Sequence, residues 1–135
     1  MSYFADKTET LIAAGSASSS GRYTQISSCD MLTMTVVLSV SAATLQGTIA
    51  LGCTNDDPEV SAFPAMTGGT AITAMPTGFT YSSSTGLITL NNPSVGISEM
   101  TVSYTQFTKW IRASYTYTSG GGSVDLKVIT SAWSV

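Results

Sequence analysis

The stretch Trp110-Ile-Arg-Ala-Ser-Tyr-Thr-Tyr-Thr-Ser-Gly-Gly-Gly-Ser-Val-Asp-Leu-Lys-Val-Ile-Thr130 decides the fold, because apolar and polar side chains alternate along both of its arms. Strand side chains point to opposite faces in turn, so such alternation is typical of a half-buried strand. One face of the first arm carries Ile111, Ala113, Tyr115 and Tyr117, and one face of the second carries Val124, Leu126 and Val128. Residues 119–122 contain the glycines that a tight turn favours. This pattern predicts a β-hairpin.

A second alternating pair lies in the N-terminal half, at residues 31–40 and 45–53. Its first arm alternates Leu32, Met34, Val36, Leu38 and Val40 with polar residues, and its second arm has Leu45, Gly47, Ile49, Leu51 and Cys53 on one face. Small residues at 41–44 separate the two arms. We therefore predict a second hairpin, with both apolar faces on the same side.

Shorter strands are expected in the rest of the chain, separated by turn signals about every ten residues. They are predicted at residues 10–14, 23–26, 71–74, 78–81, 87–90 and 100–104. Prolines at 58 and 64 make residues 54–64 a loop, from which Phe63 and Met66 are expected to fold back onto the sheets.

About eight or nine short strands and no convincing helix predict an all-β fold, an antiparallel β-sandwich that is jelly-roll-like. A ligand-holding barrel is less favoured, because the middle third offers only short, uneven strands. A helix over residues 6–14 is the competing interpretation of the N-terminal region. We expect residues 1–9 to form an arm and residues 10–135 to form a single domain.

The composition excludes some partners. The chain has 135 residues, a net charge of −3 and only 10% charged residues, against roughly 25% in a typical soluble protein. Nucleic-acid binding requires a basic footprint, so nucleic acid is not expected as a partner. We expect neither a signal peptide nor a membrane span, because no apolar run is long enough. So little charge suggests a surface that partners cover, or a protein that is stabilised outside the cell.

Catalytic chemistry has few candidates here. The chain contains no histidine, which is the commonest general base and metal ligand. No serine or cysteine stands in a nucleophile-elbow pattern. The sequence therefore predicts a non-enzymatic protein without a cofactor. Cys29 and Cys53 are expected to be free thiols, with a disulfide between them as the alternative.

Three acidic residues cluster in one loop, namely Asp56, Asp57 and Glu59. Hard carboxylate oxygens after a strand could bind Ca²⁺, with Asn55 and loop carbonyls completing the shell. The EF-hand spacing is missing. The alternative is a solvated turn whose Asn and Asp side chains bond their own backbone.

Aromatic residues gather in the C-terminal third. Tyr115 and Tyr117 share the apolar face with Ile111 and are expected in the core, which leaves Trp110 and Trp133 as candidates for the surface. Trp133 lies in a predicted short tail, residues 131–135, and needs a surface to pack on. These tryptophans could stack on a sugar or lie in a subunit contact. Arg112 beside Trp110 is a candidate contact pair, because arginine and aromatic residues dominate protein interfaces.

Two short motifs resemble a known group of proteins. Gly52-Cys-Thr-Asn-Asp56 ends a strand, and Lys109-Trp-Ile-Arg-Ala-Ser-Tyr115 opens the C-terminal stretch. Both resemble small β-sandwich virion proteins of tailed bacteriophages, where a strand ends in Gly-Ser-Asn-Asp-Gly before a Trp and a later strand reads Tyr-Val-Arg. Here Asp57-Pro58 replaces the glycine, and Phe63 is the nearest substitute for the Trp.

The resemblance covers about residues 10–130 and implies a structural role on a virion. The implied protein is most often a capsid decoration or cement protein, and sometimes a head-fibre or tail component. It would be made in the host cytoplasm, bind the major capsid protein or other virion proteins, and form a homo-oligomer, with a trimer favoured. The resemblance carries over no catalytic residue. A carbohydrate-binding module that uses Trp110 or Trp133 and the acidic loop is the alternative from a different class.

Overall fold

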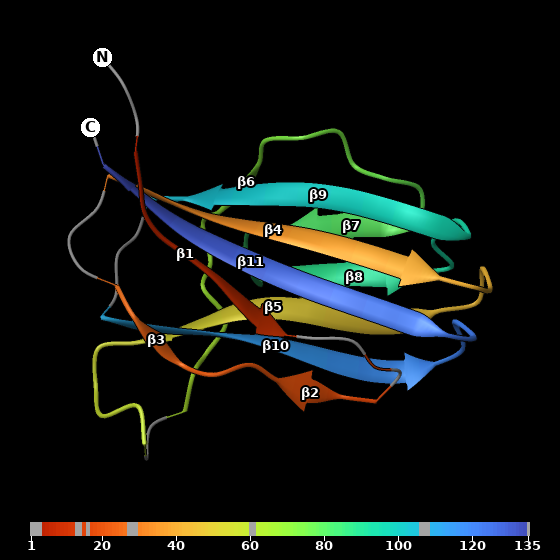
Figure 1. Ribbon diagram of the computed structural model, residues 1–135, viewed down its shortest axis with the longest axis horizontal. Coiled ribbons are helices and arrows are strands. Elements are labelled where there is room, and N and C mark those ends of the chain that lie inside the picture. Colours follow the sequence, from red (N-terminus) through yellow and green to blue (C-terminus); the bar gives the residue numbers. More distant parts are fainter. Residues whose placement is uncertain are drawn as a thin grey trace.

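The computed structural model describes residues 4–12, 15, 17–26, 30–59, 62–105 and 109–134. These residues contain eleven β-strands. They form two antiparallel sheets packed face to face (Figure 1). The β11 sheet has the order β1 (Phe4–Ile12), β11 (Val124–Ser134), β4 (Met31–Val40), β9 (Gly96–Tyr104) and β6 (Thr70–Ala71). The β10 sheet has the order β2 (Ser19–Ser20), β10 (Trp110–Ser119), β5 (Gln46–Thr54), β8 (Leu87–Asn91) and β7 (Phe79–Ser82), and β3 (Thr24–Gln25) also pairs with β10. The predicted all-β sandwich is confirmed.

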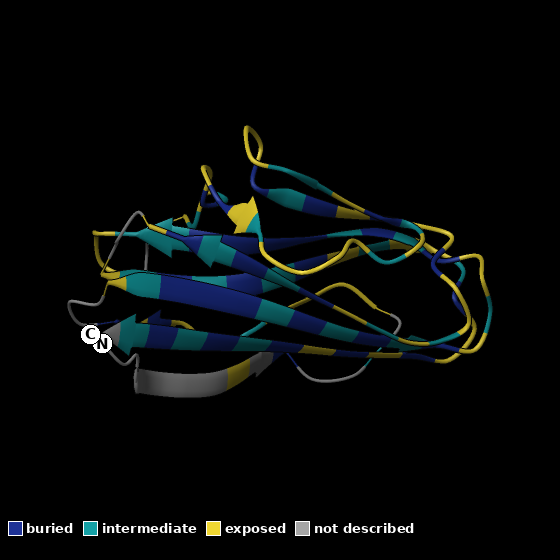
Figure 2. Ribbon diagram, turned by 90° about the horizontal axis from the view of Figure 1, so that it is seen from above, coloured by how far each residue is buried: buried dark blue, intermediate teal, exposed yellow. Residues whose placement is uncertain are grey.

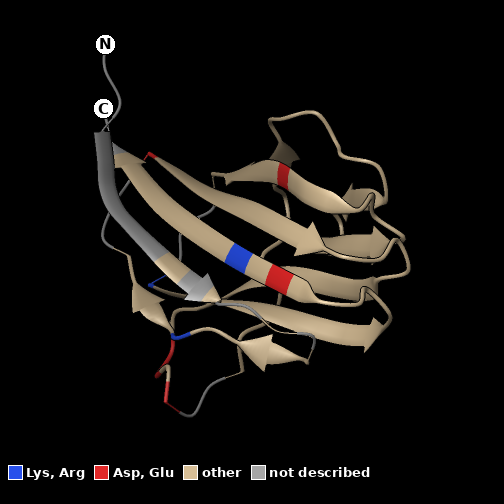
Figure 3. Cartoon of the chain, turned by 45° about the vertical axis from the view of Figure 1, so that its right-hand side comes forward, with Lys and Arg blue, Asp and Glu red and all other residues tan. Residues whose placement is uncertain are grey.

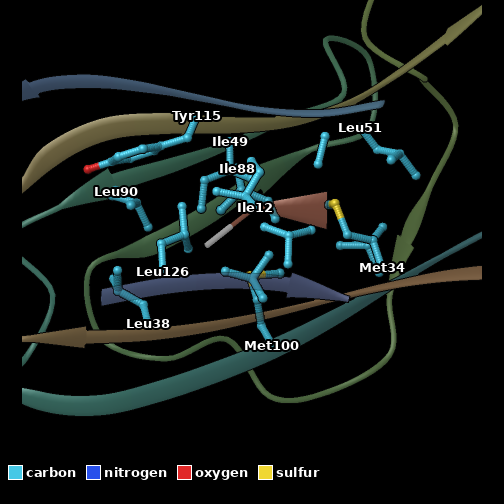
Figure 4. Packing of buried hydrophobic residues seen from close by; sticks show 14 of the residues in the cluster. Ile12, Met34, Leu38, Ile49, Leu51, Ile88, Leu90, Met100, Tyr115 and Leu126 are labelled. Carbon is cyan, nitrogen blue, oxygen red and sulfur yellow. The ribbon is translucent and has the colours of Figure 1, made fainter. Parts of the chain in front are cut away.

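One hydrophobic core fills the space between the sheets. Buried and partly exposed residues alternate along the long strands, as Figure 2 shows. The largest fully buried side chains are Tyr104, Leu32, Met34, Leu38, Leu45, Ile49, Leu51, Met66, Ile88, Leu90, Met100 and Ile111. Figure 4 shows Leu38, Met100 and Leu126 of the β11 sheet facing Ile49 and Leu90 of the β10 sheet. The alternation therefore predicted correctly which side chains point inward.

The two predicted hairpins are wrong, although their strands are in the predicted places. β10 and β11 lie in different sheets, and so do β4 and β5. β11 pairs instead with β4, so that Leu126 lies opposite Leu38, and β10 pairs with β5. A strand buries alternate residues whether its sequence neighbour lies beside it or across the core. The pattern alone cannot distinguish these two arrangements.

Two crossing loops, residues 41–45 and 120–123, carry the chain between the sheets and pack against each other. The Ser41 amide donates a hydrogen bond to the Gly121 carbonyl (3.2 Å), and the Gly121 amide donates to Thr44 Oγ1 (3.0 Å). The Ser123 amide donates to Ser41 Oγ (2.7 Å). Both loops lie at the same end of the sandwich in Figure 1. These contacts couple the two crossovers.

Both ends of the chain continue as strand beyond the predicted bounds. β1 begins at Phe4, inside the segment expected to be an arm, and runs antiparallel along β11. The alternative helix over residues 6–14 is therefore wrong over the described residues 6–12. β11 runs to Ser134, so Trp133 belongs to a strand rather than to a tail. The edge of β11 supplies hydrogen bonds to β1, a stabilisation that no local sequence pattern records.

Candidate functional site

A surface pocket opens beside β10, where the pairing of its edge is interrupted. β2 pairs with β10 at Ser114 and Tyr115, and β3 pairs with it at Trp110 and Ile111. Residues 21–23 connect β2 to β3 without belonging to either strand. The pocket has a volume of about 260 Å³ and is lined by Gly21, Arg22, Tyr23 and Arg112. Because Arg22 and Arg112 are the only arginines of the chain, this arginine pocket contains both of them.

The Arg112 side chain is positioned by a glycine on the neighbouring strand. Gly52 lies directly opposite Arg112, and a Cβ at position 52 would come within 2.7 Å of the Phe63 Cβ. The missing side chain lets Phe63 lie against the sheet, where Arg112 Cζ is 4.5 Å from the centroid of the Phe63 ring. A guanidinium over a ring face at this distance makes a cation–π contact. Phe63 thus supports the arginine that the sequence singled out.

Phe63 is held in place by a segment that extends the β10 sheet. β8 pairs with β5 only as far as Ala50, so beyond this residue another segment can pair with the edge of β5. There the Met66 amide donates to the Leu51 carbonyl (2.7 Å), and the Cys53 amide donates to the Pro64 carbonyl (3.0 Å). Met66 is buried. The prediction that Phe63 and Met66 fold back onto the sheets is confirmed.

Aromatic side chains form the rim of the arginine pocket. The rings of Tyr23 and Trp110 meet edge to face, with centroids 5.5 Å apart and planes at 89°. Lys109 Nζ lies 5.9 Å from the Trp110 ring. The Tyr23 hydroxyl donates a hydrogen bond to Glu59 Oε1, and this bond raises the pKa of Tyr23 above its usual value. Trp110 is half-buried in these contacts, and Glu59 is held at the rim.

The acidic loop has the geometry of a turn. Asp56 Oδ1 accepts a hydrogen bond from the Asp57 amide (2.8 Å), and Asp57 Oδ1 accepts one from the Glu59 amide (3.0 Å). Asn55 Oδ1 accepts one from the Lys109 amide (2.8 Å). Over the described part of the chain, no group of three metal-ligating side chains comes together. The hydrogen bonds that Asp56 and Asp57 accept within the loop are those expected of the solvated-turn alternative.

We expect the midpoint of thermal unfolding to be the same in calcium and in EDTA, because Asp56 and Asp57 already accept backbone hydrogen bonds. A calcium ion at a hundred times its dissociation constant would instead stabilise the fold by roughly 2.7 kcal/mol. Scanning calorimetry of the protein in the two buffers measures the difference. A higher midpoint in calcium that disappears in the Asp57→Asn variant would contradict the turn interpretation.

The other predicted site residues lie away from the arginine pocket. Trp133 is half-buried in the β11 sheet, where its Nε1 donates to Thr33 Oγ1 (3.0 Å) on the neighbouring strand. The structure therefore does not bring it together with Trp110 and Arg112. Cys53 is a free, half-buried thiol, and burial raises its pKa, which disfavours the reactive thiolate. Cys29 lies outside the described residues, so the predicted state of the pair is untested.

The outer face of the β10 sheet is almost free of charge. Arg112 is the only charged residue in the six strands of this sheet. Strand pairing aligns four hydroxyl side chains in one row across this face: Thr116, Thr48, Thr89 and Thr80. In Figure 3 the charged strand positions that the structure describes lie mainly on the β11 sheet, which carries Glu99, Asp125 and Lys127. We call the threonine-rich surface the neutral face.

Of the four residues that line the arginine pocket, sequence reasoning singled out only Arg112. Trp110 and Arg112 were candidates, but Arg22 and Tyr23 follow a Ser/Gly-rich run that carries no periodic signal. The concentration of both arginines of the chain at one pocket follows only from the pairing of β2 and β3 with β10. No local pattern of residues records this pairing.

Comparison with known proteins identifies no relative. No family model, no curated protein and no solved structure matches the chain. A functional assignment has to rest on the residues and the geometry described above. The described chain also has no helix that could cross a membrane.

Proposed function

We propose that the chain is a non-enzymatic structural protein of a tailed-phage virion, a capsid decoration protein that binds the major capsid lattice as a homotrimer. The neutral face carries the proposal. Exposed protein surfaces usually contain about 25–35% charged residues, whereas the centres of protein interfaces are depleted of charge. A sheet of six strands with one charged residue is therefore suited to being covered by another protein.

The pairing of the strands is compatible with this role. The first long strand pairs with the last (β1 with β11), and inside this pair lie β2 and β3 with β10, then β4 with β9, and finally β5 with β8. Such nested pairing, wrapped into two sheets, is what we expect of a jelly roll. Viral capsid domains and lectin domains both use this fold. The nested pairing supports the jelly-roll part of the proposal, and the neutral face favours the structural role.

The composition supports a non-enzymatic role. Histidine is missing from the chain, the carboxylates of Asp56 and Asp57 accept hydrogen bonds from backbone amides, and that of Glu59 accepts one from the Tyr23 hydroxyl. Two arginines and Tyr23 meet at the arginine pocket, an arrangement suited to binding.

The mass of the purified protein in solution tests the proposal. Light scattering behind a sizing column is expected to give the mass of three chains of 14.0 kDa each, and the trimer is expected to bind capsids that lack it. A protein that stays monomeric at high concentration and does not bind such capsids would overturn the proposal. Labelling of the tail or fibre in electron micrographs of virions would instead support the tail or fibre alternative.

A carbohydrate-binding module is the second candidate, and Trp110 is the residue it would use. Sugars stack on an open aromatic face. The Trp110 ring already meets the Tyr23 ring in an edge-to-face contact and has Lys109 over its face, which leaves less of it for a sugar. Binding to soluble glycans that disappears in the Trp110→Ala variant would favour this candidate over the virion protein.

A further inference from the structure

We infer that the arginine pocket is a binding site for a carboxylate, the side chain of an aspartate or glutamate that a partner protein presents. The inference rests on the geometry of this pocket and does not depend on a virion location. It goes beyond the proposed function because it names the chemical group that the surface recognises. Four observations carry it: the distribution of charge, an unused hydrogen-bond donor, the support of Arg112 by Phe63, and the size and aromatic rim of the pocket.

The first observation is the distribution of positive charge. The chain has five cationic residues and a net charge of −3, yet two of the five line this one pocket. Within the strands of the β10 sheet, Arg112 is the only charge of either sign. The nearby Glu59 accepts the hydrogen bond of Tyr23. The pocket therefore brings two positive charges together next to a face that is otherwise neutral, with the carboxylates of Glu59 and Asp57 near its Tyr23 side.

The second observation is an unused hydrogen-bond donor. Arg112 Nε is buried and has no hydrogen-bond partner among the described residues. A buried donor without an acceptor destabilises a protein unless a partner supplies the acceptor. Arginine binds a carboxylate through two parallel N–H groups in a planar fork. Because Nε itself is covered, a carboxylate in the pocket would accept from the two terminal nitrogens of the guanidinium.

The third observation is that the Arg112 side chain is already held in place for such a bond. The Phe63 ring lies 4.5 Å from Arg112 Cζ and covers one face of the guanidinium, so the planar group loses less freedom when it binds. Gly52 keeps Phe63 in this place, because a side chain at position 52 would overlap it. The ligand must then approach the edge of the guanidinium, where the donors point.

Size and surroundings favour a side chain over a small free ligand. The pocket of about 260 Å³ is smaller than the roughly 300–1,000 Å³ of most small-molecule sites. Its rim carries Tyr23 and Trp110 in edge-to-face contact, and tyrosine, tryptophan and arginine are the residues enriched in protein hot spots. An acidic side chain from a protein that covers the neutral face would fit this arrangement.

Nitrogen-15 NMR tests the inference directly on the whole protein. Because the chain has two arginines, its spectrum contains two arginine Nε–Hε signals, which Arg→Lys variants assign. We expect titration with a blocked glutamate, N-acetyl-glutamate amide, to shift the Arg112 signal downfield and to slow its exchange with water. The matched blocked glutamine, which lacks the charge, is expected to leave it unchanged.

Three variants separate the pocket from general charge effects. Arg112→Lys removes the fork, and Arg22→Gln removes the second charge, so each is expected to weaken binding of blocked glutamate by at least about fivefold. Lys127→Gln removes a charge from the other sheet and is expected to leave binding unchanged. An unchanged backbone spectrum in each variant shows that the fold is intact.

Other outcomes overturn the inference. Equal shifts with blocked glutamate and blocked glutamine, or none with either, would show that no carboxylate site exists. Inorganic phosphate that binds about tenfold more tightly than the carboxylate would assign the pocket to free or esterified phosphate instead. A monomeric protein that does not bind capsids but still binds blocked glutamate would remove the virion proposal and keep this site, so the two can fail separately.

Discussion

The Gly120→Ala variant is expected to lose about 4 kcal/mol of unfolding free energy, a large effect for a change of one methyl group. Gly120 has a φ of +74°, a backbone conformation that L side chains rarely adopt. A Cβ there would also overlap the carbonyl oxygen of Thr44 in the other crossing loop. Backbone atoms cannot rotate away, so the two crossing loops would have to separate. Urea unfolding followed by circular dichroism measures the loss.

Gly96→Ala is the matched control for this prediction. Gly96 also has a positive φ, +102°, but a Cβ added there would meet nothing within 4 Å. We expect Gly96→Ala to lose only the unfolding free energy that comes from backbone strain, about 1 to 2 kcal/mol. The difference between the variants then reports the contact between the crossing loops. Equal losses would mean that the two loops do not pack as described, and that the crossovers between the sheets are held in another way.

Leu126→Ala is expected to lose about 3 to 4 kcal/mol of unfolding free energy, within the range for a large buried aliphatic residue. Leu126 is 0% exposed and lies in the core opposite Leu38 of the neighbouring strand. Truncation leaves a cavity between the two sheets, and the pairing of β11 with both β1 and β4 hinders its collapse. Thermal and urea unfolding of the variant, compared with the natural protein, test this value.

Lys127→Ala on the same strand controls for this prediction, because its side chain is exposed on the outer face. Exposed substitutions away from special features usually change stability by no more than about 0.5 kcal/mol. If Lys127→Ala lost as much as Leu126→Ala, the assignment of inner and outer faces along β11 would be wrong. The same result would also contradict the alternation on which the fold prediction depends.

The candidate site shows where sequence reasoning succeeds and where it stops. Trp110 and Arg112 were singled out because an outward arginine beside an aromatic residue is typical of contact surfaces, and both border the arginine pocket. Trp133 was grouped with them for its residue type, yet it lies in the β11 sheet, where it hydrogen-bonds to Thr33 on the neighbouring strand. Arg22 is one of five cationic residues in the chain, and no local sequence pattern connects it with Arg112. Its place beside Arg112 depends on how residues 21–23 pass the edge of β10.

The sequence predicts most of the strands and the side chains they bury, because the alternation of polar and apolar residues acts over a few neighbouring positions, but it misses β2 and the outer ends of β1 and β11. Only the tertiary structure decided which strands pair. Residues 31–40 and 45–53 predict the same inner faces for a hairpin as for two strands on opposite sides of a core. The choice depends on contacts between distant residues, such as Gly121 with Thr44 and Leu126 with Leu38. No local pattern contains these contacts, and the arginine pocket likewise depends on the pairing of β2 and β3 with β10.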